Sequence, residues 1–159
     1  MRIRSFFKKK IIDPLAGLLR QGVSPRMLAW SLSIGMAVGF SPLIGLTTLL
    51  CTGIAFALKL NPVAINLANW LVYPLQILLF LPFLRFGSNI FGIEFPDLEL
   101  SQIMAWFQES PWRGIQTLGV SYLAGSLVWL LASVPFVLVT QQIIFLIINK
   151  AKRPSQPVK

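Results

Sequence analysis

The sequence predicts an all-α integral membrane protein with two full crossings, a re-entrant helical hairpin and interfacial amphipathic helices. Of the 159 residues, 55% are hydrophobic and 12% are charged, with a mean hydropathy of +0.73. A soluble domain carries about 25% charged residues. The apolar residues form two long tracts, 27–92 and 115–148, and only Lys59 and Arg85 are charged within them. Each tract is longer than the about 20 residues that one helix needs to cross a bilayer.

The residue inventory removes most catalytic chemistries. The absence of histidine excludes His-based triads and His-ligated zinc. The single cysteine, Cys51, lies in an apolar run and is expected to act as a small hydrophobic side chain. The net charge of +9 comes from basic residues beside apolar tracts, which argues against nucleic-acid binding. We therefore expect no catalytic residue, no metal site, no cofactor, no nucleic-acid partner and no enzymatic activity.

Residues 1–24 are expected to form a basic segment on the cytoplasmic side. Basic side chains alternate there with apolar ones, which favours a short segment lying on an anionic leaflet. The alternative is a loose cytoplasmic tail. Asp13 and Pro14 interrupt the apolar run after the basic cluster, so the segment is not expected to be a cleaved secretory signal.

Residues 25–148 are expected to form a single membrane domain. Ser24-Pro25 combines an N-cap residue with proline at the first helical position, which predicts a helix over 25–41. A second short apolar segment follows over 43–60. The remaining elements are a span over 62–84 with Pro62 at its first position, an external amphipathic segment over 92–114 that Pro111 closes, a long span over 115–148 and a basic cytoplasmic tail over 149–159.

The basic termini predict an even number of crossings, because Lys and Arg favour the cytoplasmic side. Residues 25–60 then form a re-entrant hairpin with its tip at Pro42–Gly45, and four thin crossings are the alternative. Pro135 lies inside the last tract, which is either one kinked helix or two short segments. We favour one helix, since no polar turn accompanies the proline.

Small residues recur at four-residue spacing in the first helix. Ser31, Gly35 and Gly39 share one face and allow close approach of another backbone. We expect this face to pack on a neighbouring helix or on a second copy of the chain, and the latter makes a homo-oligomer a possible partner. Chance enrichment of small residues is the alternative.

Two polar features are candidates for ligand binding. The tip combines a helix break with hydroxyl groups at the start of the next helix, a combination that suits an anionic or polar group. The predicted span over 62–84 carries a polar stripe, formed by Asn66, Asn69, Tyr73 and Gln76, whose residues share one face. Unpaired amides are unfavourable in hydrocarbon. The candidate ligand-binding residues are Pro42, Gly45, Thr47, Thr48, Asn66, Asn69, Tyr73 and Gln76.

Each feature also has a purely structural explanation. The tip residues are then a turn whose hydroxyls cap a helix, and the stripe provides hydrogen bonds between helices. Arg20 and Arg26, beside the mouth of the hairpin, are candidates for contact with lipid phosphates or are ordinary positive-inside anchors.

Several linked motifs resemble those of a bacterial membrane family, domain of unknown function 2062. They are Gly22-Val23-Ser24-Pro25, Phe40-x-Pro42-x-x-Gly45-x-x-Thr48, Leu60-Asn61-Pro62 and Asn69-Trp70-x-x-x-Pro74-Leu75. The resemblance covers about residues 15–148. It implies a small polytopic membrane protein. Because some family members carry a glycosyltransferase module on the same chain, it also hints at envelope or lipid-linked sugar work.

The sequence thus favours a non-enzymatic, multi-pass protein of the bacterial inner membrane with both termini cytoplasmic. We expect it to bind or move an amphiphilic, phosphate-bearing lipid or lipid carrier in envelope biogenesis. The alternative is a membrane scaffold or assembly protein that packs through its small-residue helix faces. The lipid bilayer and an amphiphilic lipid ligand are the expected partners.

Overall fold

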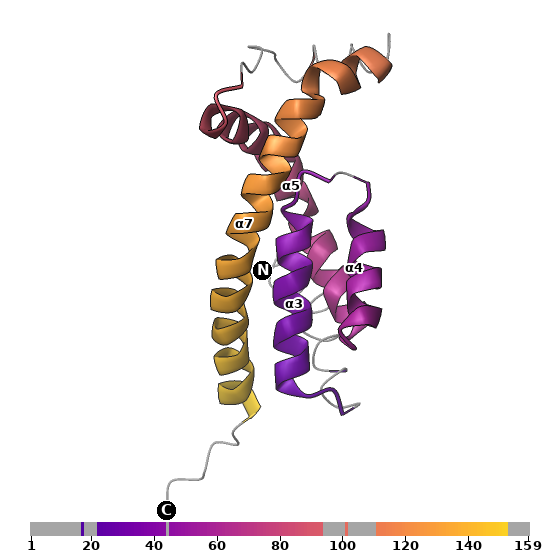
Figure 1. Ribbon diagram of the computed structural model, residues 1–159. Coiled ribbons are helices and arrows are strands. Elements are labelled where there is room, and N and C mark those ends of the chain that lie inside the picture. The colour runs from indigo at the N-terminus through magenta and orange to yellow at the C-terminus, as the bar shows by residue number, and fades with distance from the viewer. Residues whose placement is uncertain (1–16, 18–21, 44, 94–100, 102–110, 153–159) are drawn as a thin grey trace, which may run out of the picture.

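The structure, a computed structural model, describes residues 17, 22–43, 45–93, 101 and 111–152. Its helices are α3 (Pro25–Gly39), α4 (Thr47–Ala57), α5 (Pro62–Ile90) and α7 (Pro111–Lys152) (Figure 1). The described residues contain no strand, which confirms the all-α prediction for this part of the chain. Two helical segments, Pro62–Ile90 and Gly119–Lys150, are long and apolar enough to cross a membrane.

Local capping fixes the starts of α3 and α5. The Ser24 side chain accepts a hydrogen bond from the backbone N–H of Met27 at 3.2 Å, and Pro25 follows it. The Asn61 side chain likewise accepts from the N–H of Ala64 at 2.9 Å, and Pro62 follows. Both starts lie where the sequence predicts them, because an N-cap and a first-turn proline are local features.

The helix ends differ from the predicted ones. The hairpin helices are shorter than the predicted 25–41 and 43–60, because the turn between them extends from Phe40 to Leu46. In contrast, α5 continues to Ile90 instead of ending near residue 84, and it contains Pro74 and Pro82.

The second long helix is longer than predicted and continuous. It extends beyond 115–148 at both ends and holds Pro135 inside it, so the last tract is one helix. Pro111 was predicted to close the preceding segment, but it is the first residue of α7, a position that suits proline. Residues 112–114 of the predicted amphipathic segment also belong to α7, and its residues 94–100 and 102–110 lie outside the described residues.

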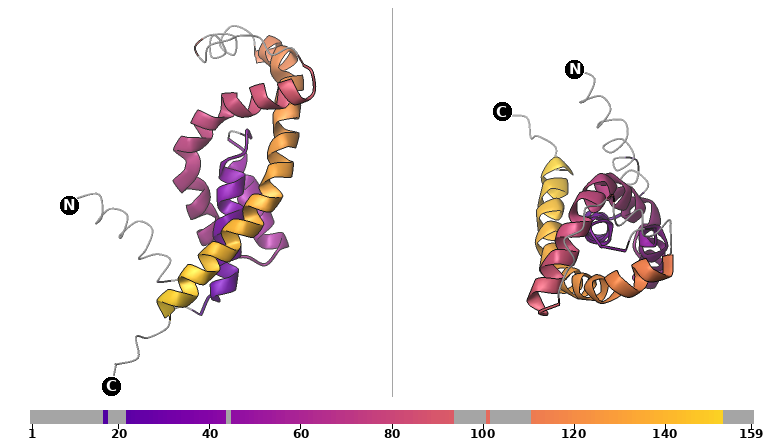
Figure 2. Two further views of the ribbon diagram at one scale, coloured as in Figure 1. Left: turned by 90° about the vertical axis from the view of Figure 1, so that its left-hand side faces the viewer. Right: turned by 90° about the horizontal axis from the view of Figure 1, so that it is seen from above.

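The helices form an up-and-down bundle. In Figure 1, α3 ascends, α4 descends beside it, and α7 descends along the opposite side. Figure 2 shows that α5 curves over the hairpin towards the start of α7. Its two internal prolines account for this bend. The start of α3 and the end of α7 therefore lie at the same end of the bundle.

Close backbone contact joins α3 to α5. A Cβ atom built on Gly35 would overlap the carbonyl oxygen of Ile65 and lie 2.9 Å from the Cβ of Ala68. One turn on, a Cβ on Gly39 would lie 3.0 Å from the carbonyl oxygen of Asn69. The small-residue face is thus covered by a helix of the same chain.

A serine extends this contact at the lower end of α3. The Ser31 hydroxyl accepts a hydrogen bond from the backbone N–H of Asn61 at 3.0 Å and donates to the carbonyl of Met27 at 2.8 Å. The start of α5 is thereby held against α3. Ser31, Gly35 and Gly39 all serve this one helix pair.

A second close crossing joins α5 to α7. A Cβ on Gly87 would lie 2.7 Å from the backbone carbon of Ala124, and one on Gly125 would lie 3.0 Å from the carbonyl oxygen of Phe83. The two glycines face each other, so the backbones touch where α5 reaches the top of the bundle. This crossing was not predicted from the sequence.

The buried interior is made mainly of small side chains. Cys51 is fully buried beside Val38, Ala55 and Ile65, in keeping with the expected role of a small hydrophobic residue. Buried serines add to this interior, and the Ser33 hydroxyl donates to the carbonyl of Ala29 at 2.8 Å. Small side chains let the helices approach closely, as in membrane helix pairs.

Gly35→Ala is expected to lower the free energy of unfolding by about 1–3 kcal/mol, because the added methyl group overlaps the backbone of α5. The matched control is Gly53→Ala in α4, where a Cβ has nothing within 4 Å. The control should be neutral or stabilising by about 0.5–1 kcal/mol. Unfolding in detergent micelles, followed by far-UV circular dichroism, measures both variants. Equal stabilities would contradict this packing.

Candidate functional site

The turn at the top of the hairpin breaks α3 inside the bundle. The N–H of Ser41 binds the carbonyl of Val38 at 3.0 Å, so the last turn tightens and the carbonyl of Ala37 loses its usual donor. Pro42 is buried and has no N–H to donate. Gly45 has φ of +88°, which lets the chain reverse before α4.

Side chains from two other helices cap this broken end. The Gln76 side chain of α5 donates from Nε2 to the carbonyl of Ser41 at 2.9 Å. The Trp129 indole of α7 donates from Nε1 to the carbonyl of Ala37, also at 2.9 Å. Backbone carbonyls at a helix end need donors when no water is at hand. Gln76 supplies one of these donors from α5, and Trp129 supplies the other from α7.

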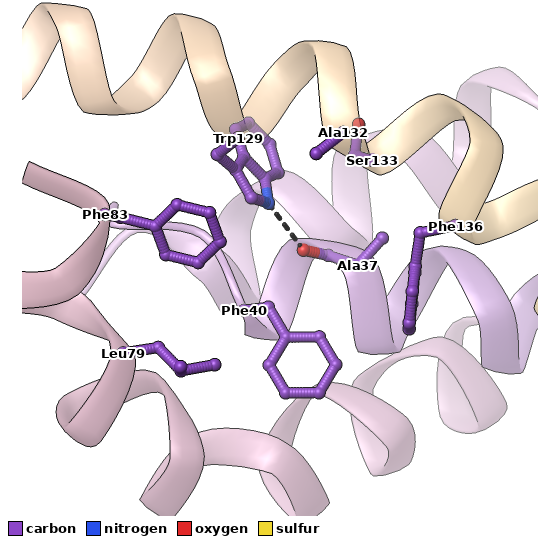
Figure 3. Close-up of a pocket in the computed structure, with 8 residues that line it drawn as sticks. All are labelled: Ala37, Phe40, Leu79, Phe83, Trp129, Ala132, Ser133 and Phe136. Atoms are coloured by element: carbon purple, nitrogen blue, oxygen red, sulfur yellow. Dashed lines mark hydrogen bonds between the residues drawn. The ribbon is translucent and has the colours of Figure 1, made fainter. Parts of the chain in front are cut away.

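An apolar groove of about 270 Å³ lies beside the capped end (Figure 3). Helices α3, α5 and α7 all contribute to it. Figure 3 shows the rings of Phe40, Phe83, Trp129 and Phe136 around it. Phe40 and Phe136 meet edge to face, with ring centroids 5.6 Å apart. The lining residues are Ala37, Phe40, Leu79, Phe83, Trp129, Ala132, Ser133 and Phe136.

The groove offers almost no polar contact. The Trp129 N–H is already bonded to Ala37, and the Ser133 hydroxyl donates to the carbonyl of Leu130 at 2.7 Å. The volume lies just below the range of about 300–1,000 Å³ that is typical of ligand pockets. These features fit a slender hydrocarbon chain.

The candidate polar residues of the tip and the stripe are divided between two helix pairs. Thr48 accepts from the indole N–H of Trp70 at 3.2 Å, and Asn66 donates from Nδ2 to the hydroxyl of Thr52 at 3.2 Å. These bonds tie α4 to α5. Asn69 and Gln76 are instead buried against α3.

The remaining candidates are distributed differently. Pro42 and Thr47 are buried, whereas Gly45 and Tyr73 are exposed. None of the predicted ligand-binding residues lines the groove. Most of the hydrogen bonds made by the stripe join one helix to another. This agrees with the explanation that the stripe has a structural role. Arg26 is exposed at the start of α3, and Arg20 lies outside the described residues.

Asn69 differs from the other members of the stripe. Its side chain is 1% exposed, yet neither Oδ1 nor Nδ2 has a hydrogen-bond partner. Gln76 uses its amino group and leaves Oε1 without a partner. Most buried polar atoms in proteins are bonded. Asn69 is therefore the residue of the stripe with the most unused hydrogen-bonding capacity.

The groove residues were not predicted from the sequence. One signal was available, because Trp129 lies in the middle of an apolar tract whereas membrane tryptophans gather at the interfaces. A central indole indicates an internal acceptor for its N–H. The contributions of Phe40, Phe83 and Phe136 depend on how three helices converge, and periodicity along one helix does not reveal that.

Gln76→Met is expected to lower the free energy of unfolding by about 1–3 kcal/mol. Methionine keeps the length and the apolar packing of the side chain but leaves the carbonyl of Ser41 without its donor. Ile77→Met, at the exposed neighbouring position, should change stability by about 0.5 kcal/mol or less. Denaturation in detergent micelles gives the comparison, and equal effects of the two substitutions would rule out this capping role.

A family model described as "Uncharacterized protein conserved in bacteria (DUF2062)" matches residues 8–153, nearly the whole chain. Neither a curated protein nor a solved structure matches it. The match confirms the resemblance drawn from the linked motifs, over a somewhat wider range. The chain is a member of this uncharacterised bacterial family, domain of unknown function 2062.

Proposed function

We propose that this protein is a non-enzymatic, multi-pass protein of the bacterial inner membrane that holds the hydrocarbon chain of a membrane amphiphile. The apolar groove between α3, α5 and α7 carries this proposal. Its lining contains no acid or base, and its one hydroxyl is bonded to a backbone carbonyl. Those features favour binding over chemistry.

The outer surface supports membrane insertion. Large apolar side chains point outward from three helices, with Leu49 and Phe56 of α4 each 72% exposed and Leu131 of α7 73% exposed. A water-soluble protein rarely exposes large contiguous apolar patches. In a bilayer the same side chains contact lipid, while the small residues pack inside.

The positions of the charges support the orientation. Arg26 at the start of α3, Lys59 in the turn after α4 and Lys150 near the end of α7 are all exposed, and these segments lie towards one end of the bundle (Figure 1). Basic residues favour the cytoplasmic side. We place this end, with both termini, in the cytoplasm.

The lengths of the hairpin helices support a re-entrant arrangement. The 15 residues of α3 extend about 22 Å and the 11 residues of α4 about 16 Å, at 1.5 Å per residue. The hydrocarbon core is about 30 Å thick. A helix break within the core requires internal backbone partners, and Gln76 and Trp129 provide them.

The depth of the groove favours chains from one leaflet. Ala37 and Phe40 lie 12 and 15 residues after Pro25, about 18–22 Å along α3 from the basic end. That places the groove beyond the midplane of a core about 30 Å thick. The groove is then within reach of acyl chains from the leaflet opposite the cytoplasm. A role in envelope biogenesis would follow if the bound amphiphile were a lipid carrier.

The hairpin is tested by cysteine labelling in intact cells with a membrane-impermeant maleimide. Ile90→Cys at the end of α5 should react from outside, and Lys150→Cys only after permeabilisation. Leu46→Cys, 54% exposed at the tip, should react poorly from either side because the tip ends in hydrocarbon. Native Cys51 is fully buried and serves as the background. Four complete crossings would instead make Leu46→Cys as reactive as Ile90→Cys.

The groove is tested with a phosphatidylglycerol that carries a photoactivatable diazirine in its acyl chain. After reconstitution and irradiation, labelled peptides should contain groove residues such as Leu79 and Phe83 more often than Leu49 on the outer face of α4. Ala132→Phe should block the groove and reduce this labelling about tenfold, whereas Ala57→Phe at the exposed end of α4 should not. Uniform labelling of all lipid-facing helices would reject a specific groove.

A further inference from the structure

The lower half of α7 has little to pack against within the described part of the chain. Within Gly119–Lys150, only 6% of an apolar stretch of 18 residues is buried. The side of the helix that faces the bundle includes Gln141, which is buried, and Thr140 and Ile144, which are half-buried. Farther around the helix lies a second face, which begins beside Gln141 and is mostly exposed.

This outward face has the spacing of a helix-pairing seam. Its residues follow one another at alternating steps of four and three, the heptad repeat of two helices that wind around each other. All of them are exposed except Phe145, which is half-buried. The outward heptad face consists of Leu131, Pro135, Leu138, Gln142, Phe145 and Asn149.

The amide of Gln142 makes this face different from a surface that only contacts lipid. It lies eight residues before Lys150, about 12 Å along the helix, and its side chain is exposed. At that depth hydrocarbon offers no partner for its donors and acceptor. Asn149, seven residues on, occupies the same heptad position nearer the end of the span. Two amides thus recur at one position of the repeat.

We propose that the outward heptad face of α7 binds the same face of a second copy of this chain within the membrane. Both copies insert with the basic end in the cytoplasm, so their α7 helices run parallel. A two-fold axis along the membrane normal then brings each residue opposite itself. Gln142 meets Gln142, and a primary amide is self-complementary because it both donates and accepts. A polar residue at one heptad position also fixes the register of a parallel pair.

This inference rests on the membrane insertion proposed above but not on the groove. The groove-lining residues of α7 are Trp129, Ala132, Ser133 and Phe136, and none of them belongs to the outward heptad face. The association also differs from one through Ser31, Gly35 and Gly39, since those residues are covered by α5.

Disulfide cross-linking tests the face directly. Single cysteines are placed at each position from 138 to 147 in the full chain, which is then reconstituted in phosphatidylethanolamine–phosphatidylglycerol vesicles and oxidised. Dimer formation should peak at 138, 142 and 145. It should be low at Ile147, which is 62% exposed but lies on another side of the helix. The parent chain, with only buried Cys51, gives the background. A flat profile, or a peak at 147, would overturn the proposal.

The role of the amide is tested by energy transfer between labelled copies as the protein is diluted in lipid. Gln142→Leu should weaken association roughly 3- to 30-fold, the range expected for interhelical hydrogen bonds in membranes. Gln142→Asn should retain most of it, and Ile147→Leu should match the parent. Association that Gln142→Leu leaves unchanged would refute the pairing.

Flotation of each variant with its vesicles separates the two proposals. A variant that floats but does not associate overturns the pairing alone and leaves membrane insertion standing. A parent chain that does not float overturns both. Photolabelling of the groove in the same samples should be equal in the parent and in Gln142→Leu, because the outward heptad face shares no residue with the groove lining.

Discussion

A helix that ends inside an apolar bundle leaves carbonyl groups that need donors from elsewhere. In this protein the end of α3 receives them from Gln76 on one side and Trp129 on the other, each at 2.9 Å. Without such donors, a break at Pro42 would leave buried carbonyls unbonded, which is unfavourable by about 1–3 kcal/mol for each group. The positions of α5 and α7 around α3 therefore depend on the need of these carbonyls for hydrogen-bond donors.

The close helix crossings follow from the same requirement. The side chain of Gln76 reaches Ser41 because Gly35 and Gly39 let α5 lie against the backbone of α3. At the top, Gly87 and Gly125 bring α7 against α5. Where the three helices converge, the large rings cannot interdigitate as closely as the small residues do. The apolar groove lies at that place.

The sequence predicted the features that depend on neighbouring residues. The caps at Ser24 and Asn61 are local, so the starts of α3 and α5 were correct. The end of α5 was not correct: the predicted span ended beside Arg85, whereas the helix continues to Ile90 and packs Gly87 against the backbone of α7. Helical spacing identified the polar face of α5 but not its neighbours. Asn66 therefore turned out to face α4, while Gln76 caps α3.

The length of α7 explains why its two halves differ. Its 42 residues extend about 63 Å, whereas α3 extends about 22 Å, so much of α7 has no neighbour among the described residues. In the proposed membrane location, lipid would contact the exposed leucines of that remainder, because a lipid tail is as apolar as leucine. It does not satisfy Gln142, whose amide needs a donor and an acceptor at the same depth. In the proposed pairing, a helix of another copy, carrying the same amide in the same register, would provide both.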